Sequence, residues 1–296
     1  MLAQVILTPT ESKKLIAKAV AQMPAVRRAN ETGMVVLHPS SSNYFIAEEL
    51  TGQKPGTPVW LCGAIVPKGA CIEMAVNGEQ RSEADIAKYD GSGFRHSLVI
   101  KNGVLTQGTG MREILAEMGP DDVYVKGGNA LDINGNVGVL LGNPTKGGSS
   151  ITQVIAAAKQ KGFHVIVPIG LEKLISVPLD EAVKAARFRE CELGMGLACA
   201  LLPLRLGEVV TEIKAFEILG GVKATQIAAG GLGGAEGAVT LILEGDDAGV
   251  RKAFAYAEQS KGAQLPEVRL LNCLACPRGS DGRCPFPVGD KHWNLW

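Results

Sequence analysis

The sequence predicts an α/β protein in which helices cover a mainly parallel β-sheet, joined to a smaller α+β unit and an irregular tail. Three observations predict it. Short apolar runs typical of buried strands alternate with helical patterns over the first two-thirds of the chain, an order that builds parallel sheets. Of the 296 residues, 46% are hydrophobic, which is enough for a substantial core. Beyond residue 204 the order of the elements changes, and beyond residue 270 Cys, Pro and Gly become frequent.

The first helix is predicted to begin at Pro9, because proline suits the first position of a helix. Thr8 can cap this helix, and Glu11 completes a capping box. Apolar residues then recur at helical spacing, at Leu15, Ile16, Val20 and Met23. We expect this stripe to face the core.

Strands and helices alternate between this helix and residue 203. Apolar runs predict strands at residues 34–37, 59–66, 97–100, 122–125, 137–141 and 165–167. Helical patterns occupy residues 43–50, 111–118 and 151–161. The pair Asn102-Gly103 predicts a tight hairpin.

The order helix, strand, strand, helix follows, and it predicts a small α+β unit of ferredoxin-like type. Its elements are predicted at residues 211–219, 225–228, 238–243 and 246–260. We therefore divide the chain into an α/β ligand-binding domain (1–203), a small α+β domain (204–270) and a Cys/Pro-rich tail (271–296).

The charge balance bears on the class of partner. Lys and Arg total 30, Asp and Glu total 30, and no basic stripe interrupts the sequence. A nucleic-acid-binding protein normally has an excess of basic residues or a basic stripe, so we expect no nucleic-acid partner. The N-terminus lacks the pattern of a secretory signal, and apolar runs such as 197–203 are far shorter than a membrane span of about 20 residues. We predict a cytoplasmic homo-oligomer whose partner is a small-molecule anion, with no membrane contact.

Three loops are predicted to bind that anion, because they follow strands and carry hydroxyls, glycines or a lysine at the start of a helix or strand. They are Ser40, Ser41 and Ser42; Lys126, Gly127, Gly128 and Asn129; and Thr145, Lys146, Gly147, Gly148 and Ser149. The last loop is the best phosphate cradle, although it does not match the P-loop pattern. The alternative is that the serines only cap helices and the glycines only shape turns.

Two stretches of the chain resemble the superfamily of ribose-phosphate isomerase, glucosamine-phosphate deaminase, the CoA-transferases and regulatory subunits of the translation-initiation exchange factor. Residues 34–42 and the helix after them are similar to that superfamily's strand, Gly-Ser-Thr loop and helix. Residues 123–166 are similar to its segment of strand, GA[DN]A loop, Asn-Gly turn, strand and helix. The resemblance implies a parallel α/β domain that binds a sugar phosphate or an acyl or CoA-type anion.

The resemblance also implies catalytic roles for two carboxylates. Asn129 stands where an isomerase has an acidic residue, and an amide cannot transfer a proton. Asp132 would then act as the base, or Glu172 would act as a base or as the nucleophile of a transferase. The alternatives are that Asp132 shapes an Asx-type turn beside Asn134 and that Glu172 is a solvated helix residue.

The tail carries a candidate metal site. Cys273, Cys276 and Cys284 have C-x2-C-x7-C spacing, and His292 follows. Zn or an Fe–S cluster needs about four such ligands, so His292, or the distant Cys191 or Cys199, would complete the set. Free thiols are the alternative.

We therefore expect a cytoplasmic protein that binds a phosphorylated or acyl/CoA-type anion, with isomerase-like or transferase-like turnover left open. The alternatives are a non-catalytic ligand sensor or assembly protein and a metal-binding redox protein that uses the C-terminal cysteines.

Overall fold

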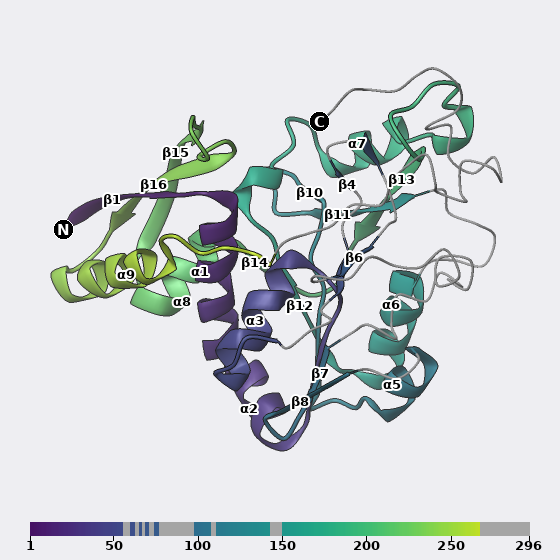
Figure 1. Cartoon of the computed structure of the whole chain (residues 1–296), viewed down its shortest axis with the longest axis horizontal. Helices are drawn as coiled ribbons and strands as arrows, with labels where there is room; N and C mark the ends of the chain where they lie inside the picture. The colour runs from purple at the N-terminus through teal and green to yellow at the C-terminus, as the bar shows by residue number, and fades with distance from the viewer. Residues whose placement is uncertain are drawn as a thin grey trace.

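A six-stranded mixed sheet forms the centre of the fold (Figure 1). The computed structural model describes residues 1–55, 60–62, 65–66, 69–70, 74–76, 98–107, 111–142 and 150–266. The strand order is β14-β12-β9-β2-β7-β8, in which the first four strands are parallel and the last two form an antiparallel hairpin. The strands are β14 (Glu208–Val210), β12 (His164–Pro168), β9 (Val123–Val125), β2 (Met34–Leu37), β7 (Leu98–Lys101) and β8 (Val104–Gln107).

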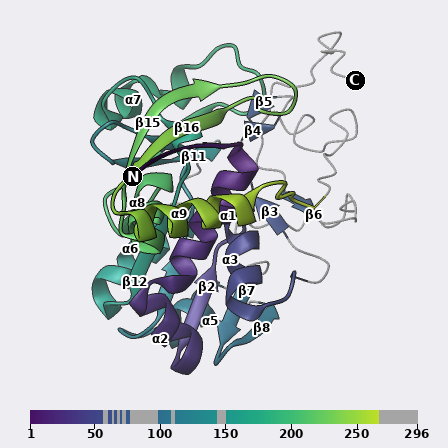
Figure 2. The same cartoon turned by 90° about the vertical axis from the view of Figure 1, so that its left-hand side faces the viewer.

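Helices cover this sheet on both faces, with α1, α2 and α3 on one side and α5 and α6 on the other (Figures 1 and 2). They are α1 (Pro9–Gln22), α2 (Pro24–Thr32), α3 (Ser41–Thr51), α5 (Met111–Glu117) and α6 (Ser150–Lys161). Every residue of β2 and β9 is buried, which explains why these strands are continuous apolar runs rather than alternating ones. The predicted α/β architecture is confirmed at this level.

Local signals account for where several elements begin and end. The Thr8 hydroxyl accepts a hydrogen bond from the Glu11 N–H at 3.4 Å, and Glu11 Oε2 accepts one from the Thr8 N–H at 2.8 Å. The capping box at the start of α1 is therefore confirmed. The hairpin between β7 and β8 is also confirmed, because Asn102 and Gly103 have φ values of 49° and 76°, the left-handed conformation that this turn requires.

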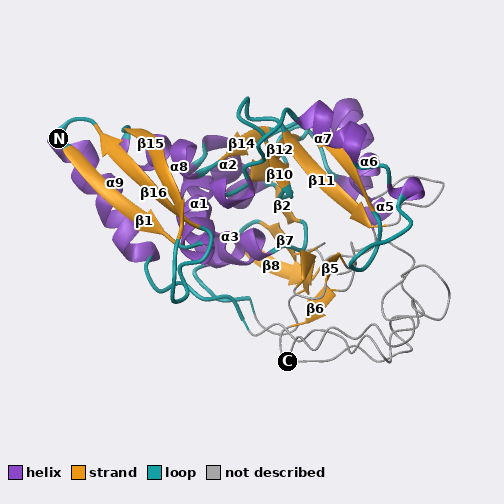
Figure 3. Ribbon diagram, turned by 90° about the horizontal axis from the view of Figure 1, so that it is seen from above, coloured by secondary structure: helices purple, strands orange, loops and turns teal. Residues whose placement is uncertain are grey.

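A second, antiparallel sheet combines strands from opposite parts of the sequence, in the order β1-β16-β15 (Figure 3). Strand β1 (Leu2–Leu7) pairs with β16 (Ala238–Glu244), which pairs in turn with β15 (Lys223–Gly230). Helices α8 (Glu212–Gly220) and α9 (Asp247–Ser260) pack beside it. The predicted helix, strand, strand, helix order is present, and the N-terminal residues add a strand to it. The domain limits at residues 203 and 270 and the ferredoxin-like type stay predictions.

The remaining described elements are short; three of them form a third sheet, ordered β10-β11-β13, and α7 and η2 contact it. They are β10 (Ala130–Leu131), β11 (Val137–Gly142), β13 (Cys199–Leu204), β3 (Trp60–Cys62), β6 (Met74–Val76), β4 (Ile65–Val66), β5 (Gly69–Ala70), α7 (Leu179–Ala185) and the 3-10 turns η2 (Leu171–Lys173) and η3 (Phe188–Glu190). Within the described ranges, no helix has both the length and the apolar character that a membrane crossing requires.

Candidate functional site

The parallel strands bring four loops to one edge of the sheet. Because β2, β9, β12 and β14 run in the same direction, their carboxyl ends lie together. The chain leaves these ends at residues 38–42, 126–129, 169–173 and 211–212. In open α/β sheets, ligands bind at this edge.

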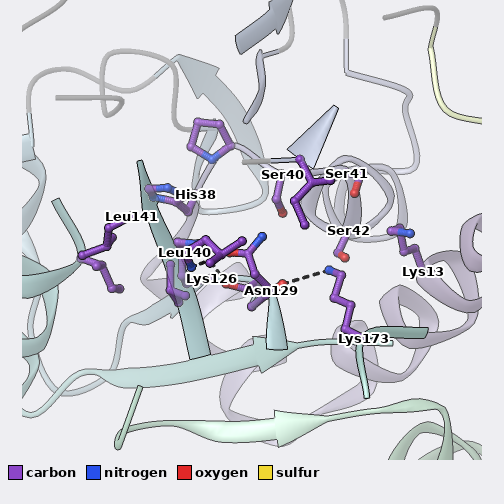
Figure 4. Close-up of a pocket in the computed structure, with 16 residues that line it drawn as sticks. Lys13, His38, Ser40, Ser41, Ser42, Lys126, Asn129, Leu140, Leu141 and Lys173 are labelled. Carbon is purple, nitrogen blue, oxygen red and sulfur yellow. Dashed lines mark hydrogen bonds between the residues drawn. The ribbon is translucent and has the colours of Figure 1, made fainter. Parts of the chain in front are cut away.

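A cavity of about 340 Å³ lies at this edge (Figure 4). Its described lining includes Lys13 from α1, a group of residues from the loops after β2, β9 and β12, and aliphatic residues from β4, β11 and α6. The loop residues are His38, Pro39, Ser40, Ser41, Ser42, Lys126, Gly127, Gly128, Asn129 and Lys173, and the aliphatic residues are Ile65, Val139, Leu140, Leu141 and Ile151.

Two of the three predicted anion-binding loops therefore meet in one cavity. Ser40, Ser41 and Ser42 and the run from Lys126 to Asn129 all line it. Residues 145–149 of the third loop, Thr145 to Ser149, lie outside the described residues. The residues on either side of that loop, Leu141 and Ile151, line the same cavity. The structure places these residues around one cavity. Ligand binding by them stays a prediction.

The serine loop lines the cavity and also caps a helix. Ser40 caps α3, because its hydroxyl accepts a hydrogen bond from the Asn43 N–H at 3.3 Å. The amide group of Asn43 ties this turn to the sheet by donating to the carbonyl oxygens of His38 at 2.6 Å and Val125 at 3.0 Å. The amino end of α3 is thereby held against the cavity, where the helix dipole favours negative charge.

Three lysines reach the cavity from three different elements, and the described lining includes no carboxylate. Lys126 Nζ donates to the Gly127 carbonyl at 2.9 Å, and Lys173 Nζ donates to the Gly128 carbonyl at 3.0 Å. Lys13 Nζ lies 3.3 Å from Glu172 Oε1. The described lining therefore carries cationic side chains from three elements, which favours an anionic ligand. Burial lowers the pKa of Lys173 below its ordinary value of 10.5, and the charge of Glu172 opposes that change.

The Lys-Gly-Gly-Asn loop is shaped by close packing beneath it. A Cβ at Gly128 would lie 2.3 Å from Val137 Cγ1, so no side chain fits there. Asn129 Oδ1 accepts a hydrogen bond from the Leu140 N–H at 3.1 Å. Because a backbone N–H can only donate, this contact fixes the orientation of the amide and leaves its NH2 group to donate to a ligand.

A buried histidine also borders the cavity. His38 Nδ1 lies 2.8 Å from the hydroxyl of Tyr124, which is fully buried on β9. Burial, followed by the positive charge of Lys126, holds the pKa of His38 well below its ordinary value of 6.5. The imidazole is therefore neutral at pH 7 and adds no charge to the cavity.

Asp132 does not line the cavity, and its geometry matches the Asx-type turn rather than a base. It is 2% exposed, and its two oxygens accept hydrogen bonds from the backbone of Asn134, Asn136 and Leu179 and from the Asn136 amide. Burial alone would raise the pKa of Asp132, but these hydrogen bonds lower it below its ordinary value of 3.8. A carboxylate held in this way is a poor proton acceptor.

Glu172 is not the solvated helix residue that was its alternative interpretation. It lies in the 3-10 turn η2, and only 12% of its side chain is exposed. Its Oε1 faces Lys13, and its Oε2 is buried without a hydrogen-bond partner among the described residues. Of the two carboxylates predicted to be catalytic, this one lies next to a residue of the cavity.

The predicted metal ligands Cys273, Cys276, Cys284 and His292 lie outside the described residues. Cys191 is exposed and Cys199 is half-buried, and both are free thiols. Among described side chains, no three His, Cys, Asp or Glu residues are placed to hold a metal ion. The Zn or Fe–S site stays a prediction.

Sequence reasoning missed Lys13, Lys173 and the fully buried Glu212. A signal for two of them was available. Lys13 shares a helix face with the buried Ile16, Ala17 and Val20, and Glu212 shares one with the buried Ala215, Phe216 and Leu219. A charged residue at the start of an apolar helical stripe is costly to bury unless it has a partner, so it indicates a functional or paired group.

We compared the chain with models of protein families, with curated proteins and with solved structures, and none of the three comparisons found a match. The function must therefore be inferred from the cavity itself.

Proposed function

We propose that the protein binds a small phosphorylated or carboxylated metabolite in the cavity at the carboxyl edge of the six-stranded sheet. The observation that carries this proposal is the convergence of Lys13, Lys126 and Lys173 on one cavity whose described lining has no carboxylate. A volume of about 340 Å³ is at the lower end of the range of about 300 to 1,000 Å³ that small-molecule sites occupy.

The neutral groups of the cavity support the same class of ligand. Ser40, Ser41 and Ser42 supply hydroxyl groups at the amino end of α3, and Asn129 has an NH2 group left to donate. These donors suit the oxygens of a phosphate or a carboxylate. Figure 4 shows Lys13, Ser42 and Lys173 toward one side of the cavity and Leu141 toward the other. A ligand with an anionic group and an apolar portion would match both sides.

The resemblance to the isomerase and CoA-transferase superfamily suggests turnover as well as binding. Either reaction needs a carboxylate near the ligand. Glu172 is better situated than Asp132 for this role, because it contacts Lys13 and keeps one oxygen without a described partner. From the sequence alone, we also propose that the protein is cytoplasmic and that it forms a homo-oligomer.

Calorimetry with inorganic phosphate, sulfate, sugar phosphates and short acyl phosphates tests this function. We expect binding to the wild type, and we expect Lys126→Met to weaken it about 10- to 100-fold, the loss of one charge-assisted hydrogen bond. Lys101→Met is the matched control, because Lys101 is an exposed lysine that pairs with Glu117 outside the cavity. Absence of binding by every probe, or equal losses in both variants, would contradict the proposal.

A further inference from the structure

Two acidic side chains, the fully buried Glu212 and the 12% exposed Glu172, lie behind the cavity. Glu212 opens α8 and is fully buried, and both of its oxygens accept the Leu171 N–H, at 2.9 and 3.2 Å. Glu172 follows Leu171 directly in the sequence. Burial and the nearby charge of Glu172 raise the pKa of Glu212 from its ordinary value of 4.5 to about 7. Electrostatic repulsion between two carboxylates in a buried environment disfavours the ionisation of both.

The local backbone is shaped to hold Glu172 in this position. A Cβ at Gly170 would lie 1.8 Å from Glu172 Oε2, so the side chain folds back over the glycine and fills the space that a larger residue would occupy. Oε2 is left buried with no hydrogen-bond partner among the described residues. An unpaired buried carboxylate oxygen is costly, and protonation of Glu212 lowers the negative charge in its surroundings.

The charged groups that face the pair come from two elements and connect it to the cavity. From α1, Lys13 Nζ lies 3.3 Å from Glu172 Oε1, and the neutral Ser12 lies one residue before it. Lys173, in η2, interacts electrostatically with Glu172, Lys13 and Glu212. Lys13 and Lys173 both line the cavity, so a ligand there competes with the carboxyl pair for the same cations.

We propose that Glu172 and Glu212 form a proton-holding carboxyl pair, and that the binding of an anion in the cavity is accompanied by uptake of a proton by this pair. The inference rests on the proposed function, because it requires an anion to bind beside Lys13 and Lys173. When the anion draws Lys13 away from Glu172, the pair loses its counter-charge, and one added proton restores neutrality.

Sulfate is the probe, because it carries two negative charges and does not titrate between pH 5 and 8. Calorimetry in buffers with different ionisation enthalpies measures the protons taken up per sulfate bound. We expect net uptake near pH 7, and we expect affinity to rise by up to about tenfold for each unit of decrease in pH across that range. Sulfate binding without net proton exchange would overturn the proposal and leave the proposed function standing. No binding by sulfate or by any phosphate ester would contradict both.

Variants locate the proton. Glu212→Gln keeps an acceptor for the Leu171 N–H but cannot ionise, so we expect sulfate to bind with uptake abolished and with a flat pH profile. Glu172→Gln is a second variant with the same expected loss of uptake. Glu48→Gln is the matched control, because Glu48 is another carboxylate paired with a lysine of α1, Lys14, and it does not line the cavity. We expect wild-type uptake in the control.

Uptake that persists in both pair variants would assign the proton to another group, such as His38, and would overturn the proposal. Carbon-13 NMR of the glutamate carboxyl groups in the wild-type protein gives a test that needs no variant. We expect a carboxyl resonance that titrates near neutral pH, and its absence would also overturn the proposal.

Discussion

Replacement of Glu212 with Gln is expected to stabilise the fold at pH 8 and to have little effect at pH 5. Burial raises the pKa of Glu212 from its ordinary value of 4.5 to about 7, with the charge of Glu172 as the second cause. Between pH 4.5 and about pH 7 the folded protein keeps a proton on Glu212 that the unfolded chain has released. The stability of the wild type therefore falls as the pH rises through this window. A glutamine has no such dependence.

The size of the effect follows from the same values. A tenfold change in proton affinity corresponds to about 1.4 kcal/mol, so a rise from 4.5 to about 7 corresponds to about 3 kcal/mol at pH 8. At pH 5 the unfolded chain has released most of this proton and the folded protein keeps nearly all of it, but pH 5 lies only just above the unfolded pKa of 4.5, so the free-energy difference accumulated there is still below about 1 kcal/mol. The wild type and Glu212→Gln both offer an acceptor for the Leu171 N–H, so the comparison isolates the charge.

Urea denaturation of the wild type and of Glu212→Gln at pH 5, 6, 7 and 8 measures this contrast. We expect the free energy of unfolding of the variant, relative to the wild type, to increase steadily with pH. A relative stability that stays constant from pH 5 to pH 8 would refute the reasoning, because it would mean that Glu212 ionises with the same affinity in both states.

Two further predictions separate packing from ligand binding. Gly128→Ala places a Cβ 2.3 Å from Val137 Cγ1 and should destabilise the fold by about 1 to 3 kcal/mol in urea denaturation, whereas Gly127→Ala meets only ordinary contacts at 3.6 Å and should be tolerated; equal effects would contradict the packing argument. Asp132→Asn puts an NH2 group among donors such as the Leu179 N–H, and it should cost about 1 to 3 kcal/mol of stability. Sulfate affinity should not change. A loss of sulfate affinity without a loss of stability would indicate that Asp132 belongs to the binding site.

Much of the fold could be predicted because its signals are local. The capping box of Thr8 and Glu11, the Asn102-Gly103 turn and the apolar runs of β2 and β9 each act within a few residues. The loops of the cavity were predictable for a related reason: parallel strands place the residues that follow them at one edge, whatever the helices between them contain.

Local patterns were enough to specify the α/β class, most element positions and two of the loops that border the cavity, since these depend on near neighbours and on the rule that parallel strands end together. The pairing of the N-terminal strand with β16, the ion pair of Lys13 with Glu172 and the burial of Glu212 arise only in the folded chain. These contacts join residues that lie far apart along the chain, and no local pattern specifies which distant charge will neutralise a buried one. Long-range packing brings Glu172 to Lys13, and it buries Glu212 and so raises its pKa.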